Sequence, residues 1–324
     1  MQLNLYFTMF FAFAVSVVIC PLMIKVMRKL QYGQQIRKDG PARHLSKAGT
    51  PTAGGLVFLA AAVAGVVMRR EQIWSWELVL ILFVTLGNAL IGWMDDYAKM
   101  ARYRSLGLKA RSKLAGQSII AAVFILGLSG LDMYDPELVV PFTDITVQLG
   151  YFYPFFVIFM IAAVTNGVNL TDGIDGLATG TAVIALLAFL YIAVTKDLYG
   201  VALFCGALIG GCFGFLVYNL NPARIFMGDV GSLALGGALA AAAVLVKEEL
   251  LLVIIGGVFV LEALSVSLQV ISFKLTGRRV LLMAPLHHHF ELKGWSEWRV
   301  VTGFWGLAFI FALVGLVEMW FRSS

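Results

Sequence analysis

Acidic residues stand at the ends of two long apolar runs in this sequence. Asp95 and Asp96 close one run, and Asp229 lies where a later run begins. A carboxylate beside hydrocarbon is costly and usually has a functional reason to be there. Two adjacent carboxylates also repel each other unless a cation or a shared proton relieves them. We predict a metal site or a base at these acids; the structural alternatives are a helix-end cap at Asp95-Asp96 and an N-cap at Asp229 or Ser232.

A second polar segment covers residues 166–178 and interrupts the apolar pattern. It contains two amides, Asn166 and Asn169, and two acids, Asp172 and Asp175, among flexible glycines. The two acids are three residues apart and the downstream Glu is absent, so the segment does not fit a calcium-binding EF-hand loop. Glycines let backbone N–H groups approach a phosphate or a nucleobase, while amide and carboxylate side chains give directed hydrogen bonds. We therefore predict a ligand-binding loop.

Three of the four histidines are consecutive, at His287, His288 and His289. Successive residues in regular structure cannot all face one ion, which argues against a zinc site made of three histidines. Phosphate contacts or supporting roles fit this motif better. Lys47, Lys99 and Lys113 are candidates for neutralising phosphate charge in a transfer reaction.

The elements that position these residues are membrane spans. The chain has 324 residues, of which 60% are hydrophobic and 13% charged, with a mean hydropathy of +0.88. Apolar runs near the roughly 20 residues needed to cross a bilayer recur from end to end. We predict an all-α polytopic protein with a single domain, residues 1–324. The ten expected spans are 4–27, 52–68, 77–94, 114–131, 151–170, 177–195, 200–219, 232–246, 250–273 and 299–321.

Lysine and arginine are distributed unevenly between alternate loops, which predicts the orientation. The basic side holds clusters at residues 28–47, 99–113 and 274–293, so we expect it to be cytoplasmic and both termini to lie outside. The acids Asp95-Asp96 and Asp229, the segment 166–178 and the three consecutive histidines then all fall on the cytoplasmic side. Oxygen ligands of this kind suit Mg²⁺ that bridges substrate phosphates. Cys20, Cys205 and Cys212 lie in apolar runs without metal or redox spacing, and we interpret them as packing residues.

Taken in order, these motifs resemble the polyprenyl-phosphate N-acetylhexosamine-1-phosphate transferases, and within them the phospho-N-acetylmuramoyl-pentapeptide transferase (translocase I) branch of bacterial peptidoglycan synthesis. The resemblance covers nearly the whole chain and includes the segments 47–55 and 110–113. It implies a homodimer with ten spans in the cytoplasmic membrane, which transfers phospho-N-acetylmuramoyl-pentapeptide from UDP to undecaprenyl phosphate. Membrane lipid is an expected partner and nucleic acid is not.

The same resemblance implies roles for individual residues. Asp229 would bind Mg²⁺, and Asp95 or Asp96 would position or deprotonate the lipid phosphate. His287 and Lys113 would act on the diphosphate. The expected substrate-binding residues are Lys47, Thr52, Lys99, Asn166, Asn169, Asp172, Asp175, Phe226, Ser232, Gln269, His288 and His289, with Phe226 stacking on uracil.

Two alternatives stay open from the sequence. One keeps the chemistry but uses UDP-GlcNAc or a related nucleotide sugar. The other is a secondary transporter with a midplane site in its broken, glycine-rich segments. Against the transporter, the acids are expected at one membrane face and no inverted repeat is visible.

Overall fold

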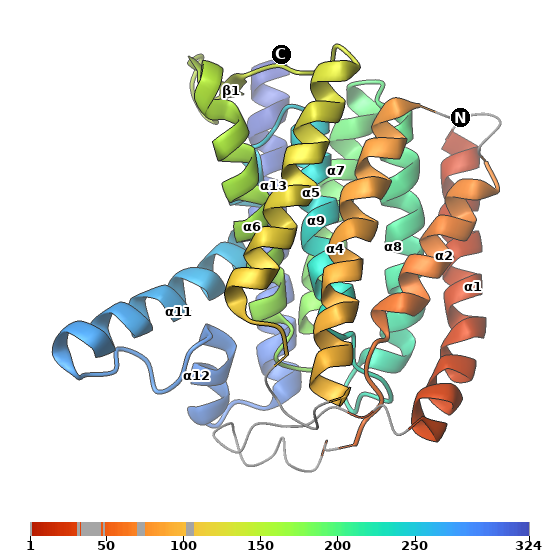
Figure 1. The fold of residues 1–324 in the computed structure, drawn as a ribbon, viewed down its shortest axis with the longest axis vertical. Helices are drawn as coiled ribbons and strands as arrows, with labels where there is room; N and C mark the ends of the chain where they lie inside the picture. Colours follow the sequence, from red (N-terminus) through yellow and green to blue (C-terminus); the bar gives the residue numbers. More distant parts are fainter. Residues whose placement is uncertain are drawn as a thin grey trace.

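The chain folds into a bundle of long helices (Figure 1). The structure is a computed structural model that describes residues 2–30, 33, 47, 49–69, 75–101 and 107–323. Its helices are α1 (Gln2–Lys29), α2 (Gly55–Val67), α4 (Trp76–Ala101), α5 (Ala110–Gly130), the 3₁₀ turn η2 (Gly150–Phe152), α6 (Tyr153–Thr171), α7 (Leu177–Thr195), α8 (Tyr199–Asn219), α9 (Gly228–Leu245), α10 (Leu251–Ile255), α11 (Gly257–Thr276), α12 (Leu286–Leu292) and α13 (Glu297–Ser323).

Nine helices in the described ranges are long and apolar enough to cross a membrane. They are α1, α4, α5, α6, α7, α8, α9, α11 and α13. The tenth expected span, 52–68, corresponds to the shorter apolar helix α2, which has 13 residues. The predicted all-α polytopic membrane architecture is therefore confirmed.

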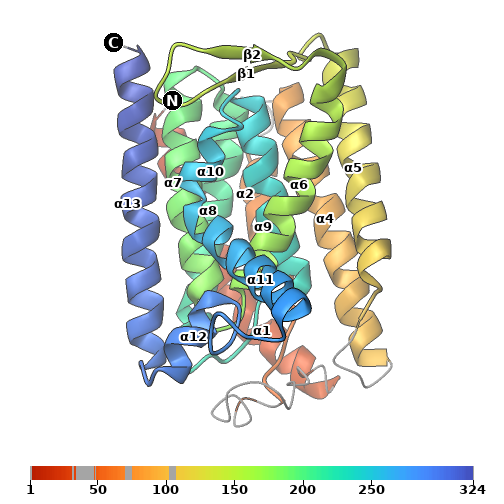
Figure 2. The same ribbon diagram turned by 90° about the vertical axis from the view of Figure 1, so that its left-hand side faces the viewer.

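The predicted continuous span 250–273 is wrong. The helix breaks at Gly256, after the five residues of α10, and a new helix, α11, begins at Gly257. Two successive glycines destabilise a helix interior, and a side chain at Gly257 would place its Cβ 2.6 Å from Phe311. As a result α11 leaves the bundle at a steep angle, as both views show (Figure 1, Figure 2).

Helix α9 lies in the middle of the bundle and packs against α4, α6, α2 and α7 (Figure 2). Its residues from Val230 to Leu245 are buried and are mostly Ala, Gly, Leu and Val. These small side chains let neighbouring helices approach closely, which membrane helices need because lipid offers them no hydrophobic driving force. The three cysteines are buried and free, as their interpretation as packing residues predicts.

Both termini lie at one end of the bundle, beside a short antiparallel hairpin (Figure 1, Figure 2). The hairpin pairs β1 (Glu137–Val139) with β2 (Thr146–Gln148), in the connection between α5 and α6. Buried ion pairs support this end. Glu248 accepts hydrogen bonds from Lys196 and, with both oxygens, from Arg322 on α13.

Candidate active site

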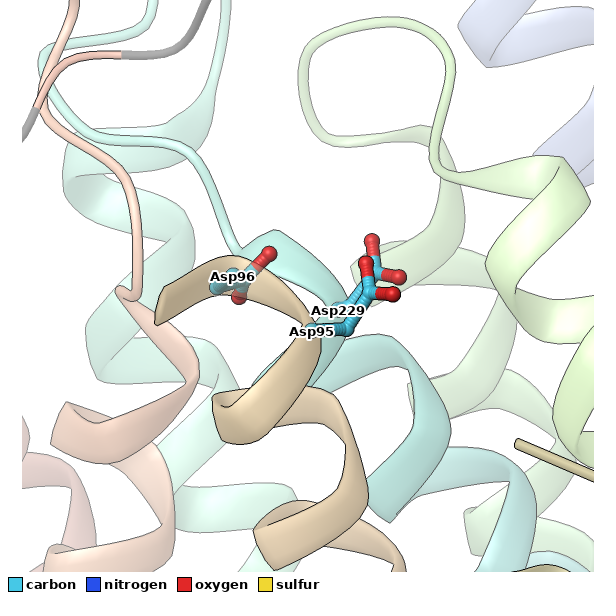
Figure 3. A group of neighbouring side chains, drawn as sticks. All are labelled: Asp95, Asp96 and Asp229. Atoms are coloured by element: carbon cyan, nitrogen blue, oxygen red, sulfur yellow. The ribbon is translucent and has the colours of Figure 1, made fainter. Parts of the chain in front are cut away.

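Three carboxylates meet at the end of the bundle opposite the termini. Asp95 and Asp96 come from the last turns of α4, and Asp229 comes from the first turn of α9 (Figure 3). One oxygen of each acid can be chosen so that all three lie within 4.8 Å of one another. Two segments more than 130 residues apart in the chain thus deliver their acids to one place.

Two glycines make this approach possible. A Cβ at Gly92, one turn before Asp96 on α4, would lie 2.1 Å from the backbone oxygen of Asp229. A Cβ at Gly228, which has a φ of +74°, would lie 2.6 Å from the Asp96 carboxylate. The positive φ itself favours glycine. The backbones of α4 and α9 can therefore touch only because neither position carries a side chain.

Two lysines hold the carboxylates together. Lys99 Nζ lies 2.7 Å from Asp95 Oδ2, 2.8 Å from Asp229 Oδ1 and 3.5 Å from Asp96 Oδ1. Lys113 Nζ, from the start of α5, lies 2.6 Å from Asp229 Oδ2 and 3.2 Å from Asp95 Oδ1. Lys99 is four residues after Asp95, so both side chains leave the same face of the helix.

The two adjacent acids have different additional partners. Asp96 accepts a hydrogen bond of 3.1 Å from the N–H of Val230, in the first turn of α9. It thus caps that helix from outside, where a negative charge is favourable. Asp95 accepts the N–H of Leu108 at 2.7 Å, and a Cβ at Gly107 would lie 2.5 Å from Asp95. Asp96 therefore caps α9 rather than the end of its own helix, while Asp95 ties the α4–α5 connection to the cluster.

The donor set fits a hard divalent cation such as Mg²⁺. All three acids offer carboxylate oxygens, the ligands that Mg²⁺ prefers. Three carboxylates against two ammonium groups leave one formal negative charge in excess. Asp229 is the least buried of the three acids, with 14% of its side chain exposed. Among them it is therefore the most accessible to an incoming ion.

The last turn of α6, in the segment predicted as a polar loop, reaches the same cluster. Asn169 donates a hydrogen bond of 2.8 Å to the hydroxyl of Ser232, one turn after Asp229 on α9. Burial, and then the charges of Asp229 and Asp96, raise the pKa of Asp172 well above its usual range. Asn166 instead donates to Ala162 and to Gln117 of α5, so it joins two helices.

Lys47 and Asp175 belong to a second ionic cluster. Lys47 Nζ lies 2.8 Å from Asp175 Oδ1 and 2.6 Å from Glu297 Oε1. Asp175 Oδ2 accepts hydrogen bonds from the Asn221 side chain and from the N–H of Ala223. Lys47 thus neutralises different acids from those that Lys99 and Lys113 neutralise.

The three histidines point in different directions. Nδ1 of His287 lies 3.1 Å from Glu262, and its Nε2 faces Gly173 without a hydrogen-bond partner among the described residues. His288 contacts Glu291, whereas Nδ1 of His289 accepts the N–H of Leu282. The argument against a three-histidine metal site agrees with this geometry. His287 is fully buried, and its ring lies against Gly173 of the polar loop.

Three further candidates have structural neighbours. The Gln269 side chain hydrogen-bonds the backbone of Val280 and Leu281, which fixes the connection between α11 and α12. Phe226 is half-buried, and its N–H donates to Pro51. Thr52 Oγ1 lies beside Gly228, 3.0 Å from where a Cβ would stand. The segment before α2 therefore lies beside Phe226 of the α8–α9 loop and Gly228 at the start of α9.

Sequence reasoning missed Glu262 and Glu297. Glu262 is the single acid in the apolar run 250–273, and its carboxylate accepts the N–H groups of Leu286 and His287 at the start of α12. A lone acid in an apolar run was a signal that could have found it. Glu297 had a weaker signal, because an acid in the first turn of a helix is common.

Fold and site together define a class: a membrane-embedded enzyme whose carboxylates and lysines gather at one end of its helices. Residues 78–247 match the sequence profile of glycosyl transferase family 4. A phospho-N-acetylmuramoyl-pentapeptide-transferase of Bacillus cytotoxicus is 52% identical over 313 residues, which cover 95% of this chain and 96% of that protein. A protein of the same name from Bacillus thuringiensis is 51% identical over 312 residues, covering 95% of this chain and 96% of that protein. The chain belongs to glycosyl transferase family 4, among relatives that carry this name over almost their full length.

Proposed function

We propose that this protein transfers phospho-N-acetylmuramoyl-pentapeptide from its UDP carrier to undecaprenyl phosphate, which gives lipid I and UMP for peptidoglycan synthesis. An oxygen of the lipid phosphate bonds to the phosphorus that carries the sugar. The bond from that phosphorus to the oxygen of the uridylate phosphate breaks, and UMP leaves with that oxygen. The observation that carries the proposal is the meeting of Asp95, Asp96 and Asp229 with two lysines, in a chain about half identical to relatives of that name.

The carboxylates and lysines have complementary tasks in this proposal. Asp229 would hold Mg²⁺, which would supply charge neutralisation for the diphosphate when bound. Lys99 and Lys113 stabilise the charge that develops on the transferred group. Asp95 or Asp96 orients the lipid phosphate or removes its proton. A phosphate monoester is mostly ionised near pH 7, so alignment contributes more than proton removal.

The nucleotide binds beside the polar loop in this proposal. Asn169, Asp172 and Asp175 hold it, and Phe226 stacks on the uracil. His287 supports the loop at Gly173 from its buried position, and its Nε2 reaches a phosphate only if that loop moves. His288 and His289 are half-buried next to it.

The proposed location is the bacterial cytoplasmic membrane, with the site on the inner side. The end of the bundle that carries the acids also carries Arg28, Lys29, Lys109 and Arg111. At the opposite end Lys196, Lys247 and Arg322 are paired with acids. Positive charge concentrates on the cytoplasmic side of membrane proteins, which supports this orientation. A homodimer is proposed by family resemblance.

A transfer assay in detergent tests the activity. The purified protein is given undecaprenyl phosphate, Mg²⁺ and either radiolabelled UDP-N-acetylmuramoyl-pentapeptide or UDP-GlcNAc. We expect labelled lipid and equimolar UMP from the first donor and not from the second. Product from UDP-GlcNAc alone would show that the protein is instead a polyprenyl-phosphate GlcNAc-1-phosphate transferase. Uptake of the nucleotide sugar into vesicles without lipid product would support a transporter.

A further inference from the structure

We infer that Glu297 is a positioning residue for the nucleotide-sugar subsite, through its contacts with Lys47, Asp175 and Asn221. The inference rests on the proposed function, because it concerns how that substrate is held. Glu297 is the first residue of α13; it follows the histidine motif closely but is far in sequence from Lys47, Asp175 and Asn221.

The carboxylate of Glu297 joins several separate segments of chain. Its Oε1 accepts hydrogen bonds from Lys47 Nζ at 2.6 Å and from the N–H of Asp175 at 3.0 Å. Its Oε2 accepts the Asn221 amide at 2.9 Å. The segment before α2, the α6–α7 loop and the α8–α9 loop are thereby fixed to the start of α13.

The burial and charge of this cluster favour positioning over general stabilisation. Asp175 is 3% exposed and Glu297 is 8% exposed, so two carboxylates share one ammonium group in a largely dry setting. Buried ion pairs are weak contributors to stability, because desolvation offsets much of the attraction. Their directed hydrogen bonds do fix geometry: the Lys47 ammonium and the Asn221 amide each bridge Asp175 and Glu297.

The segments held by Glu297 carry the proposed nucleotide contacts. Asp175 is three residues after Asp172, and Asn221 is five residues before Phe226. The ion pairs of the Asp95, Asp96 and Asp229 cluster involve Lys99 and Lys113 instead. Loss of Glu297 therefore displaces the groups around the nucleotide, while the Asp95, Asp96 and Asp229 cluster keeps its ion pairs with Lys99 and Lys113.

Steady-state kinetics with both substrates varied tests this. In Glu297→Gln, an amide NH₂ replaces one of the two carboxylate oxygens, so it faces either the Lys47 ammonium or the Asn221 amide as a second donor. We therefore expect KM for UDP-N-acetylmuramoyl-pentapeptide to rise at least tenfold. We expect kcat and KM for undecaprenyl phosphate to stay within threefold. UMP binding measured by calorimetry falls at least tenfold. Glu297→Asp, which keeps the charge at shorter reach, recovers part of the affinity.

The matched control is Glu318→Gln. Glu318 lies on the same helix, is 3% exposed and pairs with Arg322 at the other end of the bundle. We expect this variant to lose thermal stability but to keep both KM values. If Glu297→Gln does not fold, Glu297→Asp is compared with the wild type instead, with a threefold or greater rise in the nucleotide-sugar KM expected.

The inference is overturned if the nucleotide-sugar KM and UMP affinity of folded Glu297 variants stay within twofold of wild type. It is also overturned if the KM values for both substrates rise by the same factor in the Glu297 variants, because a change of that kind is not specific to the nucleotide-sugar subsite. Failure of the proposed function looks different, because the wild type itself would then form no labelled lipid.

Discussion

Replacement of Gly92 by Ala tests whether the close approach of α4 and α9 creates the active site. The added Cβ would stand 2.1 Å from the backbone oxygen of Asp229, 2.4 Å from its carbonyl carbon and 2.6 Å from Cα of Val230. All three are main-chain atoms, so no side chain can rotate away. The two helices must separate or the variant must unfold.

The separation follows from the contact distances. Ordinary contact for a Cβ begins at 3.4 Å, so the oxygen contact is about 1.3 Å too short. Overpacking of this kind costs about 1–3 kcal/mol of folding free energy. A displacement of about 1 Å at a reacting centre lowers rates by about 100-fold. Because Asp95 and Asp96 lie on α4 and Asp229 on α9, activity falls far more than stability does.

Transfer from the nucleotide sugar to undecaprenyl phosphate is measured together with the thermal unfolding midpoint in detergent. We expect Gly92→Ala to keep less than about one hundredth of the wild-type rate. Gly306→Ala on α13 is the control, since a Cβ there meets nothing within 4 Å. It should keep full activity, because alanine also favours the helix. A folded Gly92→Ala protein that turns over within twofold of wild type would refute the reasoning.

The remaining predictions concern charged groups. Asp229→Ala should abolish UMP release while the protein stays folded and inserted; near-normal turnover would remove this residue from the mechanism. Asp95→Asn should lose more activity than Asp96→Asn, because Asp95 pairs with both lysines whereas Asp96 contacts one of them and caps α9. Full wild-type rates in both variants would contradict this. Treatment with EDTA should stop turnover, and Mg²⁺ or Mn²⁺ should restore it, as followed by UMP release; undiminished turnover in EDTA would count against a metal. Glu248→Gln should lower the unfolding free energy by about 3 kcal/mol, since it weakens a buried pair, yet leave both KM values unchanged when stability and kinetics are compared.

Much of the helical architecture could be predicted because each membrane span is a long apolar run that the local composition of the sequence reveals. The run 177–195 coincides with α7, and 200–219 with α8 to within one residue. The break at Gly256 was missed because hydropathy averages over a window and a pair of glycines barely changes it. Gly257, the residue after the break, packs against Phe311 of α13, and such a contact is not visible in a local pattern.

The meeting of acids at one end of the bundle could also be predicted, since alternate loops share a membrane side. The pairing of each acid with a particular lysine could not be predicted. Lys47 was grouped with Lys99 and Lys113 on charge alone, yet it pairs with Asp175 and Glu297. Which lysine meets which acid depends on how each helix is rotated about its axis and on how the helices cross. Hydrophobic periodicity and composition do not determine either of these.

The hydrogen-bonding capacity of the lysines limits how substrates can enter this site. An ammonium group has three donors, and Lys99 directs its charge to Asp95, Asp96 and Asp229 at once. Lys113 is likewise engaged with Asp95 and Asp229. A substrate phosphate can gain these donors only if the carboxylates give them up, and a buried carboxylate gives up a cation only in exchange for another. Phosphate binding and cation binding must therefore be coupled at Asp229, where the carboxylate is the most exposed of the three.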